Sequence, residues 1–385
     1  MIVLGRGWSF GRQREASYSM FFWGLVVMLI AVPVVSQAGE AELKMEIDKL
    51  WAKMANMEGT SMADIRGTAP AEIQGGQNWT DRVTVSGVVE VETGVYDDDI
   101  VTESDIAVAT VELGIDAEVS DFSSAHVLFL SEDGGAMEVD EAAVTIGNTE
   151  KNPLYMTAGK MYVPFGNFES QMVSDPLTLD LGETGEDALL LGVEVAGFYA
   201  SVYSFNGDAD DGGDDRIEHY GTNAGYAFES DAVSIDVGGA WISSIQDSDG
   251  LTDALGLVPG AQNVLEYVGG YGAHLIAGLG PVTLIGEYVG VDDDLIGAGT
   301  DSQVSAYNVE AGVVFPLGSR EGSIAVGYQA TDEAGGAFVE ERIVAALAVE
   351  ILDGTALALE YLHEEDYDGF GTDWDIYTLQ LAAEF

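Results

Sequence analysis

Hydrophobic and polar residues alternate along the chain from residue 82 to the last residue. In RVTVSGVVEVETGVY (82–96), Val83, Val85, Val89, Val91 and Val95 fall on one face of an extended strand, and the other face is mostly polar. Successive side chains of a β-strand point to opposite faces, so this pattern predicts strands with one apolar and one polar face. In the next segment we expect one face to hold Ala107, Ala109, Val111, Leu113 and Ile115.

Sixteen segments of this kind can be placed on the sequence. They lie at 82–96, 104–118, 123–132, 136–147, 154–163, 187–195, 198–205, 217–229, 232–244, 268–279, 282–291, 302–315, 322–331, 339–352, 355–364 and 372–385. Connections after even-numbered strands are short (AG, GP, DG). Those after odd-numbered strands are longer and acidic (NGDADDGGDD), with 316–321 as a mild exception.

An even number of strands with alternating long and short connections is typical of an outer-membrane β-barrel. Lipid cannot satisfy backbone N–H and C=O groups, so only a closed sheet can present strands to it. The predicted fold is an all-β transmembrane protein, an antiparallel outer-membrane β-barrel of about 16 strands at 82–385 with a short N-terminal periplasmic α-helix. A soluble β-sandwich is the alternative, but it would rarely keep this alternation through every connection.

The first 81 residues have a different pattern. Three arginines precede the apolar run MFFWGLVVMLIAVPVV and the small residues Ser36 and Ala38, which predicts a cleaved signal peptide at 1–38. A retained anchor helix is the alternative. Residues 39–58 predict a periplasmic helix, because apolar residues recur there at heptad spacing. Residues 59–81 are small and polar and predict a linker.

Composition excludes several classes of function. The chain holds 67 acidic and 13 basic residues, a net charge of −54, and phosphate binding needs clusters of basic residues, so nucleic acid is excluded as a partner. Hydrophobic residues make up 47% of the chain, too many for a disordered protein. There is no cysteine and no catalytic motif, and the run from Asp208 fails the EF-hand pattern at Gly212 and His219. We therefore predict no catalytic residue, cofactor or metal site.

The polar face of the strands would line the barrel interior. Sixteen strands leave a lumen wide enough for water. Carboxylates in the lumen favour cations, and the inward acidic residues include Glu90, Glu92, Glu112, Asp116, Glu310 and Glu350. The expected inward cations are Arg82, Lys160 and Arg342. The alternative is that these carboxylates only hydrate the lumen.

The stretch GKMYVPFGNFESQMVSDPLTLDLGET (159–184) departs from the alternation. It forms one of the two longest connections, and loops of this length are usually functional or disordered. Prolines and a glycine fix its turns, and Phe165, Phe168, Leu177 and Leu179 can pack. Two arrangements fit: the loop folds into the lumen and narrows it, or it packs outward on its neighbours.

This stretch resembles the LbtU-type siderophore porin family, whose members share a helical segment after the signal, a 16-stranded barrel and a block YVPFG…SDPLT…LGET. The resemblance implies uptake of a ferric siderophore, with a substrate path or constriction formed by Tyr162, Pro164, Phe165, Gly166, Asp175, Pro176, Glu183 and Thr184. Energised receptors carry a large plug before a barrel of about 22 strands, and residues 39–81 are too few for one, so we expect passive diffusion.

The chain ends within a predicted strand on an aromatic residue. This end resembles the signal read by the barrel-assembly machinery of Gram-negative bacteria, and the matching residues are Tyr377, Leu379, Leu381 and Phe385. We expect an outer-membrane porin with periplasmic termini that contacts lipid and that machinery, admits a ferric siderophore or small cations, and assembles as a homotrimer. The alternatives are a cation-selective porin without a siderophore, and a structural or adhesive barrel with acidic loops.

Overall fold

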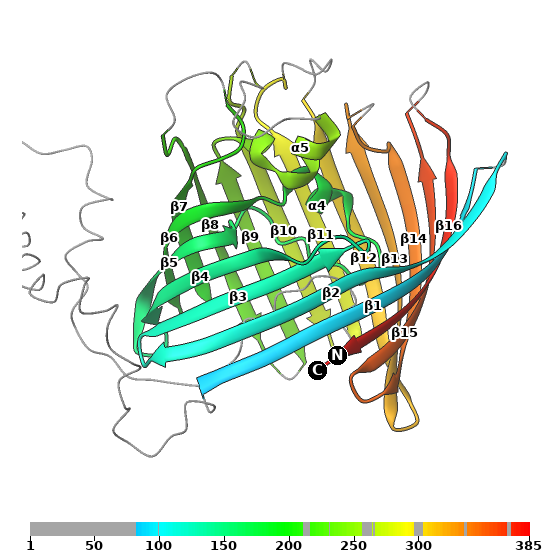
Figure 1. Ribbon diagram of the computed structural model, residues 1–385, viewed down its shortest axis with the longest axis horizontal. Helices are drawn as coiled ribbons and strands as arrows, with labels where there is room; N and C mark the ends of the chain where they lie inside the picture. The colour runs from blue at the N-terminus through cyan, green and yellow to red at the C-terminus, as the bar shows by residue number, and fades with distance from the viewer. Residues whose placement is uncertain are drawn as a thin grey trace, which may run out of the picture. The chain divides into compact units, whose positions relative to one another are not determined.

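A computed structural model describes residues 82–98, 100–210, 216–230, 232–255, 264, 266–295, 303–334, 337–367 and 371–385. The predicted signal peptide (1–38), helix (39–58) and linker (59–81) lie outside the described residues. Within these ranges the chain forms sixteen strands that close into a barrel (Figure 1).

The strands are β1 (Val83–Asp97), β2 (Thr102–Ser120), β3 (Ser123–Glu132), β4 (Glu138–Asn148), β5 (Asn152–Tyr162), β6 (Gly185–Val195), β7 (Phe198–Phe205), β8 (His219–Glu229), β9 (Val233–Ile242), β10 (Gly270–Leu279), β11 (Val282–Val291), β12 (Ser305–Leu317), β13 (Arg320–Asp332), β14 (Glu341–Leu352), β15 (Thr355–Glu365) and β16 (Trp374–Glu384). Three short helices lie in the connections: α4 (Leu177–Gly182), η2 (Ile245–Asp247) and α5 (Asp249–Leu255).

Every strand pairs antiparallel with its neighbours in sequence, and β1 closes the barrel by pairing with β16. In that seam Val91 lies opposite Leu381. The predicted fold, a closed antiparallel barrel of sixteen strands, is therefore confirmed over the described residues. The strand boundaries also agree with the predicted ones to within a few residues.

The alternation of connection lengths holds throughout the barrel. β12 extends to Leu317 and β13 starts at Arg320, so the expected exception at 316–321 is wrong, and this connection is a two-residue turn. Gly318 takes a φ of +71° there, a value that glycine adopts without strain. The long connections lie at the end of the barrel that carries α5, opposite the C-terminus (Figure 1).

A β-bulge shifts one part of the predicted face pattern. Glu90 lies opposite Thr110 but Val91 lies opposite Val108, so Ala109 is the extra residue of β2. Beyond the bulge the faces exchange, and Ile106 (71% exposed) and Val108 (43%) point outward. The prediction that Ala107 shares the face of Val111 is therefore wrong, because Ala107 lies opposite the inward-facing Glu92.

The outer face of the barrel is apolar and is bordered by aromatic rings. On β8, β12 and β16 two outward aromatic residues stand eight positions apart, which corresponds to about 27 Å along a strand; the pairs are Tyr220 and Phe228, Tyr307 and Phe315, and Tyr377 and Phe385. Exposed aliphatic residues such as Val309 and Leu379 lie between the members of each pair. Strands of outer-membrane barrels tilt by about 35–45°, so the two borders stand about 20 Å apart along the membrane normal, close to the apolar band of about 25 Å in such barrels.

Among the residues that the structure describes, no helix is both long enough and apolar enough to cross a membrane.

Candidate functional site: the lumen and its internal segment

The connection between β5 and β6 folds into the barrel. We call residues 163–184 the internal segment. Its apolar side chains Phe165, Leu177 and Leu181 are at most 1% exposed and pack against inner-wall residues such as Ile242 and Val289. Of the two arrangements that the sequence left open, the structure has the lumenal one, and Figure 1 shows α4 inside the barrel.

Three carboxylates on the inner wall hold the internal segment through hydrogen-bond donors of the chain. Glu287 on β11 accepts from the backbone N–H groups of Asn167 (2.7 Å) and Phe168 (3.0 Å). Glu310 on β12 accepts from the N–H of Gln171 (2.7 Å) and the hydroxyl of Ser170 (2.8 Å).

Glu360 on β15 continues this series. It accepts from the backbone N–H groups of Val173 (2.5 Å) and Ser174 (3.0 Å). All three glutamates are at most 6% exposed. Hydrogen bonds to ionised acceptors are about twice as strong as neutral ones. The middle of the internal segment is therefore fixed along β11–β15.

Two further wall residues fix the start of α4. Gln329 on β13 accepts from the N–H of Leu177 (3.2 Å), and Arg342 on β14 donates to the carbonyl of Asp175 (2.9 Å). Arg342 also forms an ion pair with Glu364 at 2.6 Å, and both side chains are at most 15% exposed. Arg342, one of the predicted inward cations, is thus paired with a carboxylate and also holds the internal segment.

A second long connection, between β9 and β10, packs on the internal segment. The N–H of Asp249 at the start of α5 donates to the carbonyl of Glu183 (2.9 Å), and the Asp249 carboxylate accepts from the N–H of Gly185 (3.2 Å). The two connections and the inner walls of β5–β12 share one apolar cluster, which includes Phe165, Tyr203 and Ile245. This side of the lumen is consequently filled by side chains.

The inner faces of β1, β2 and β16 are polar. Val85 and Val89 are exposed on the outer face of β1, so Glu90 and Glu92 point inward, and Gln380 donates to Glu92 at 2.9 Å. On β2, Glu112 lies opposite Val88 and Asp116 lies opposite Thr84, both on the face of β1 that carries Glu90, so the two carboxylates also point inward. Asp116 contacts His126 at 2.8 Å. Four of the predicted lumenal carboxylates thus gather on two neighbouring strands.

The other two predicted lumenal carboxylates have different surroundings. Glu310 faces inward but holds the internal segment, and Glu350 forms an ion pair with Arg320 at 3.3 Å near a short turn. The prediction that Lys160 faces inward is wrong. Its cross-strand partners are Ala142 and Asp187, and the neighbouring residues of that face are exposed on the outside.

The residues of the family block mostly shape the internal segment. Phe165 fills the apolar cluster, Pro176 precedes α4, and Thr184 donates to the carbonyl of Gly182 (3.1 Å). Tyr162 ends β5 and donates to Asp140 at 2.9 Å. Glu287 is not among the predicted lumenal carboxylates, although it is the only charged residue of β11 and its sequence position could have indicated an inward role.

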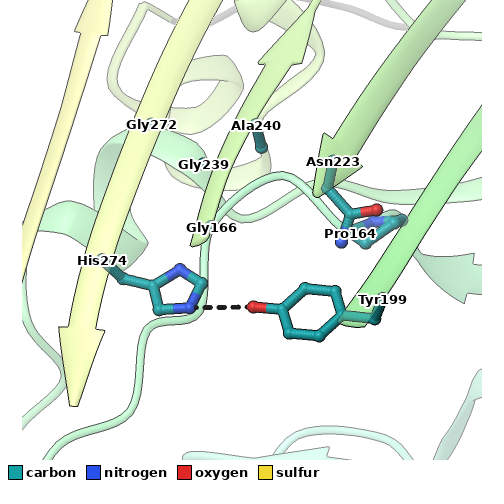
Figure 2. Close-up of a pocket in the computed structure, with 8 residues that line it drawn as sticks. All are labelled: Pro164, Gly166, Tyr199, Asn223, Gly239, Ala240, Gly272 and His274. Carbon is teal, nitrogen blue, oxygen red and sulfur yellow. Dashed lines mark hydrogen bonds between the residues drawn. The ribbon is translucent and has the colours of Figure 1, made fainter. Parts of the chain in front are cut away.

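Pro164 and Gly166 cover a small pocket on the walls of β7–β10 (Figure 2). In it the Tyr199 hydroxyl donates to Asp236 at 2.9 Å and lies 3.2 Å from Nε2 of His274, the contact drawn in Figure 2. Burial raises the pKa of Glu169 on the internal segment, and the nearby carboxylates of Asp236 and Glu310 raise this pKa further. The described part of the chain contains no cluster of three His, Asp or Glu side chains that could hold a metal ion.

The stability of α4 is expected to depend on pH through Asp180. Burial raises the pKa of Asp180 from 3.8 to about 6, although Arg342 opposes the shift. The ionised carboxyl therefore destabilises the fold at pH 7, and stability rises as the pH falls from about 6 towards 4. Asp180→Asn should raise the free energy of unfolding at pH 7.5 by about 1–2 kcal/mol and leave it nearly unchanged at pH 4. Urea titrations in detergent at both pH values measure this difference, and an equal gain at both would contradict the assignment.

The barrel has the fold of the outer-membrane porins. It superposes on the outer-membrane channel DcaP of Acinetobacter baumannii with a TM-score of 0.56 at 12% identity, covering 79% of this chain and 97% of that one. OmpF of Salmonella typhi in complex with daunomycin gives 0.57 at 12% identity (79% and 97%). An anion-selective porin from Comamonas acidovorans gives 0.54 at 14% identity (79% and 99%).

The sequence itself is similar to proteins named UPF0422. UPF0422 protein lpg2959 of Legionella pneumophila strain Philadelphia 1 is 31% identical over 302 residues, which cover 69% of this chain and 55% of that protein. The UPF0422 protein of Coxiella burnetii is 30% identical over 246 residues (61% and 52%). The chain thus spans about half the length of the curated relatives it matches. No family model matches the chain, so membership of the LbtU-type family stays a prediction.

Proposed function

We propose that the protein is an outer-membrane porin that admits small solutes by passive diffusion and prefers cations. The observation that carries the proposal is the separation of the lumen into two sides. The internal segment is held along β11–β15, whereas Glu90, Glu92, Glu112 and Asp116 gather on β1 and β2. The water-filled path then follows the acidic inner faces of β1 and β2. The charge of Arg342 is neutralised by its ion pair with Glu364. A path lined by carboxylates raises the local concentration of cations.

The apolar band between the aromatic borders supports placement in the outer membrane, with lipid around the barrel. The short turns and the C-terminus would face the periplasm and the acidic connections would face outside. The homotrimer expected from the sequence is part of the same proposal, and the mass of the detergent-solubilised protein, measured by light scattering, tests it.

The cation preference is tested with the refolded protein in a planar bilayer under a salt gradient. A carboxylate about 8 Å from a permeating ion in water changes its energy by about 0.5 kcal/mol, about twofold in concentration. Glu90→Gln combined with Glu112→Gln should therefore lower the local cation concentration about fourfold and raise the anion concentration about fourfold, so the ratio of cation to anion permeability should fall about 16-fold. The matched control is Asp353→Asn, because the Asp353 side chain is 100% exposed at a short turn.

The outcomes separate the candidate functions. An unchanged reversal potential in the double variant would place the selective carboxylates elsewhere. Absence of any current steps would favour a structural or adhesive barrel. The family resemblance implies a ferric siderophore, and a ferric polycarboxylate is itself anionic, so the acidic path should admit it poorly. Current interruptions on its addition would instead support the siderophore as the cargo.

A further inference from the structure

The three carboxylates that hold the internal segment form a regular series. Six of their donors come from residues 167 and 168, 170 and 171, and 173 and 174, so each glutamate serves two consecutive residues and the pattern repeats every three residues. Within each pair of residues the two donors bind different oxygens of the carboxylate, and the three glutamates come from different strands: β11, β12 and β15. The series therefore clamps eight consecutive residues with three side chains.

The clamped stretch has few other hydrogen-bonding partners for its backbone. Among the described backbone–backbone hydrogen bonds outside regular elements, none involves residues 166–175. A buried backbone N–H without an acceptor costs about 1–3 kcal/mol. Removal of one carboxylate thus leaves two neighbouring donors without their acceptor, and the position of the stretch depends on the glutamates.

Apolar packing is most extensive at the two ends of the internal segment, and in the middle it comes from smaller clusters. Phe165, Leu177 and Leu181 lie in the large apolar cluster with β5–β12. In the middle, Met172 packs on a smaller cluster that includes Ala325 and Ala346, and Val173 packs against Ala348 and Ala358. The ends are thus fixed by burial, and the middle is fixed by the buried Met172 side chain together with the carboxylates.

The freed middle would be long enough to obstruct the lumen. The chain from residue 166 to residue 175 has nine Cα–Cα steps and spans about 30 Å when extended. A released stretch with both ends fixed can therefore protrude about 15 Å. In the order of strands around the barrel β16 follows β15, so the polar faces of β1, β2 and β16 adjoin the β11–β15 wall. A released segment would therefore enter the path proposed above.

We propose that Glu287, Glu310 and Glu360 are positioning residues that together latch the internal segment to the β11–β15 wall, and that the pore conducts only while this latch holds. The inference rests on the proposed porin function. It assigns these three lumenal glutamates to gating, and it leaves ion selection to the carboxylates of β1 and β2.

The test compares single-channel records of the wild-type chain with those of a variant carrying Glu287→Gln, Glu310→Gln and Glu360→Gln. Glutamine keeps the side-chain length but loses the charge and one acceptor oxygen. We expect the triple variant to flicker and its open probability to fall at least fivefold. The control is Asp353→Asn, which removes a fully exposed carboxylate at a short turn, and its open probability should match the wild type.

A disulfide provides the second arm of the test. The chain has no cysteine, so Val173→Cys and Ala358→Cys introduce a single pair between residues that pack together. Oxidation of this pair in the triple-glutamine background should restore steady conduction, and a reductant should abolish it again. The same pair in the wild-type chain, oxidised, should conduct steadily even if the triple variant fails to fold.

The results distinguish the latch from the pore. Absence of current in the wild-type chain would contradict the porin function itself. Conduction by the wild type together with an unchanged open probability in the triple variant would overturn the latch alone. Failure of the disulfide to suppress flicker, with the bond verified by mass spectrometry, would also overturn it.

Discussion

Replacement of Gly87 by valine is expected to weaken the closure of the barrel. The Phe385 ring lies directly over Gly87, where a Cβ atom would collide with it. The two residues also exchange backbone hydrogen bonds, from Gly87 N to Phe385 O (3.0 Å) and from Phe385 N to Gly87 O (3.1 Å). A valine side chain must displace the ring, which is the far end of an exposed side chain, so the cost is the lost contact of the ring with β1, about 1 kcal/mol. The damage falls on the β1–β16 seam, which joins the two ends of the barrel.

The measurement is the fraction of chain that refolds into a form resistant to unfolding in SDS without heat. A loss of about 1.4 kcal/mol lowers the ratio of folded to unfolded chain tenfold. The matched control is Gly286→Val on the outer face of β11, because a Cβ atom there would meet nothing within 4 Å. Equal folding of both variants would show that the ring over Gly87 does not secure the seam.

Replacement of Arg342 by methionine is expected to destabilise the barrel by about 2–3 kcal/mol, because it leaves the largely buried Glu364 without its cation. The variant also loses the hydrogen bonds to Asp175 and Gln329 that fix the start of α4. We therefore expect a lower urea midpoint and faster proteolysis of the internal segment.

Arg320→Met is the matched control for this prediction. Arg320 also pairs with two carboxylates, Glu350 and Asp353, but the Asp353 side chain is fully exposed. Ion pairs at such positions contribute about 0–1 kcal/mol. If both arginine variants lose the same stability, Arg342 acts only through its charge and not through its place beside the internal segment.

Some of the inward carboxylates hold the internal segment and are not exposed to the open lumen. Glu310 and Glu360 follow the same alternation as Glu90 and Glu92, so the sequence treats all of them as pore-lining charges. In the folded chain the first two are at most 2% exposed and accept hydrogen bonds from the internal segment. A count of inward carboxylates therefore overstates the charge that a permeating ion would meet.

The sequence by itself determined the strands, their order and the alternation of short turns with long connections. These features follow from local rules: the period of two fixes which residues form strands, and residues such as Gly318 fix the turns. Because neighbouring strands are joined by short turns, the antiparallel order followed as well.

Only the tertiary structure decided where the internal segment lies, which carboxylates hold it, and where the faces of β2 exchange. Glu287 and Asn167 are 120 residues apart, and Glu360 and Val173 are 187 apart. No local pattern records such a contact, because it depends on closure of the whole barrel. The bulge at Ala109 likewise depends on the register between two strands, and a single extra residue inverts every face assignment beyond it.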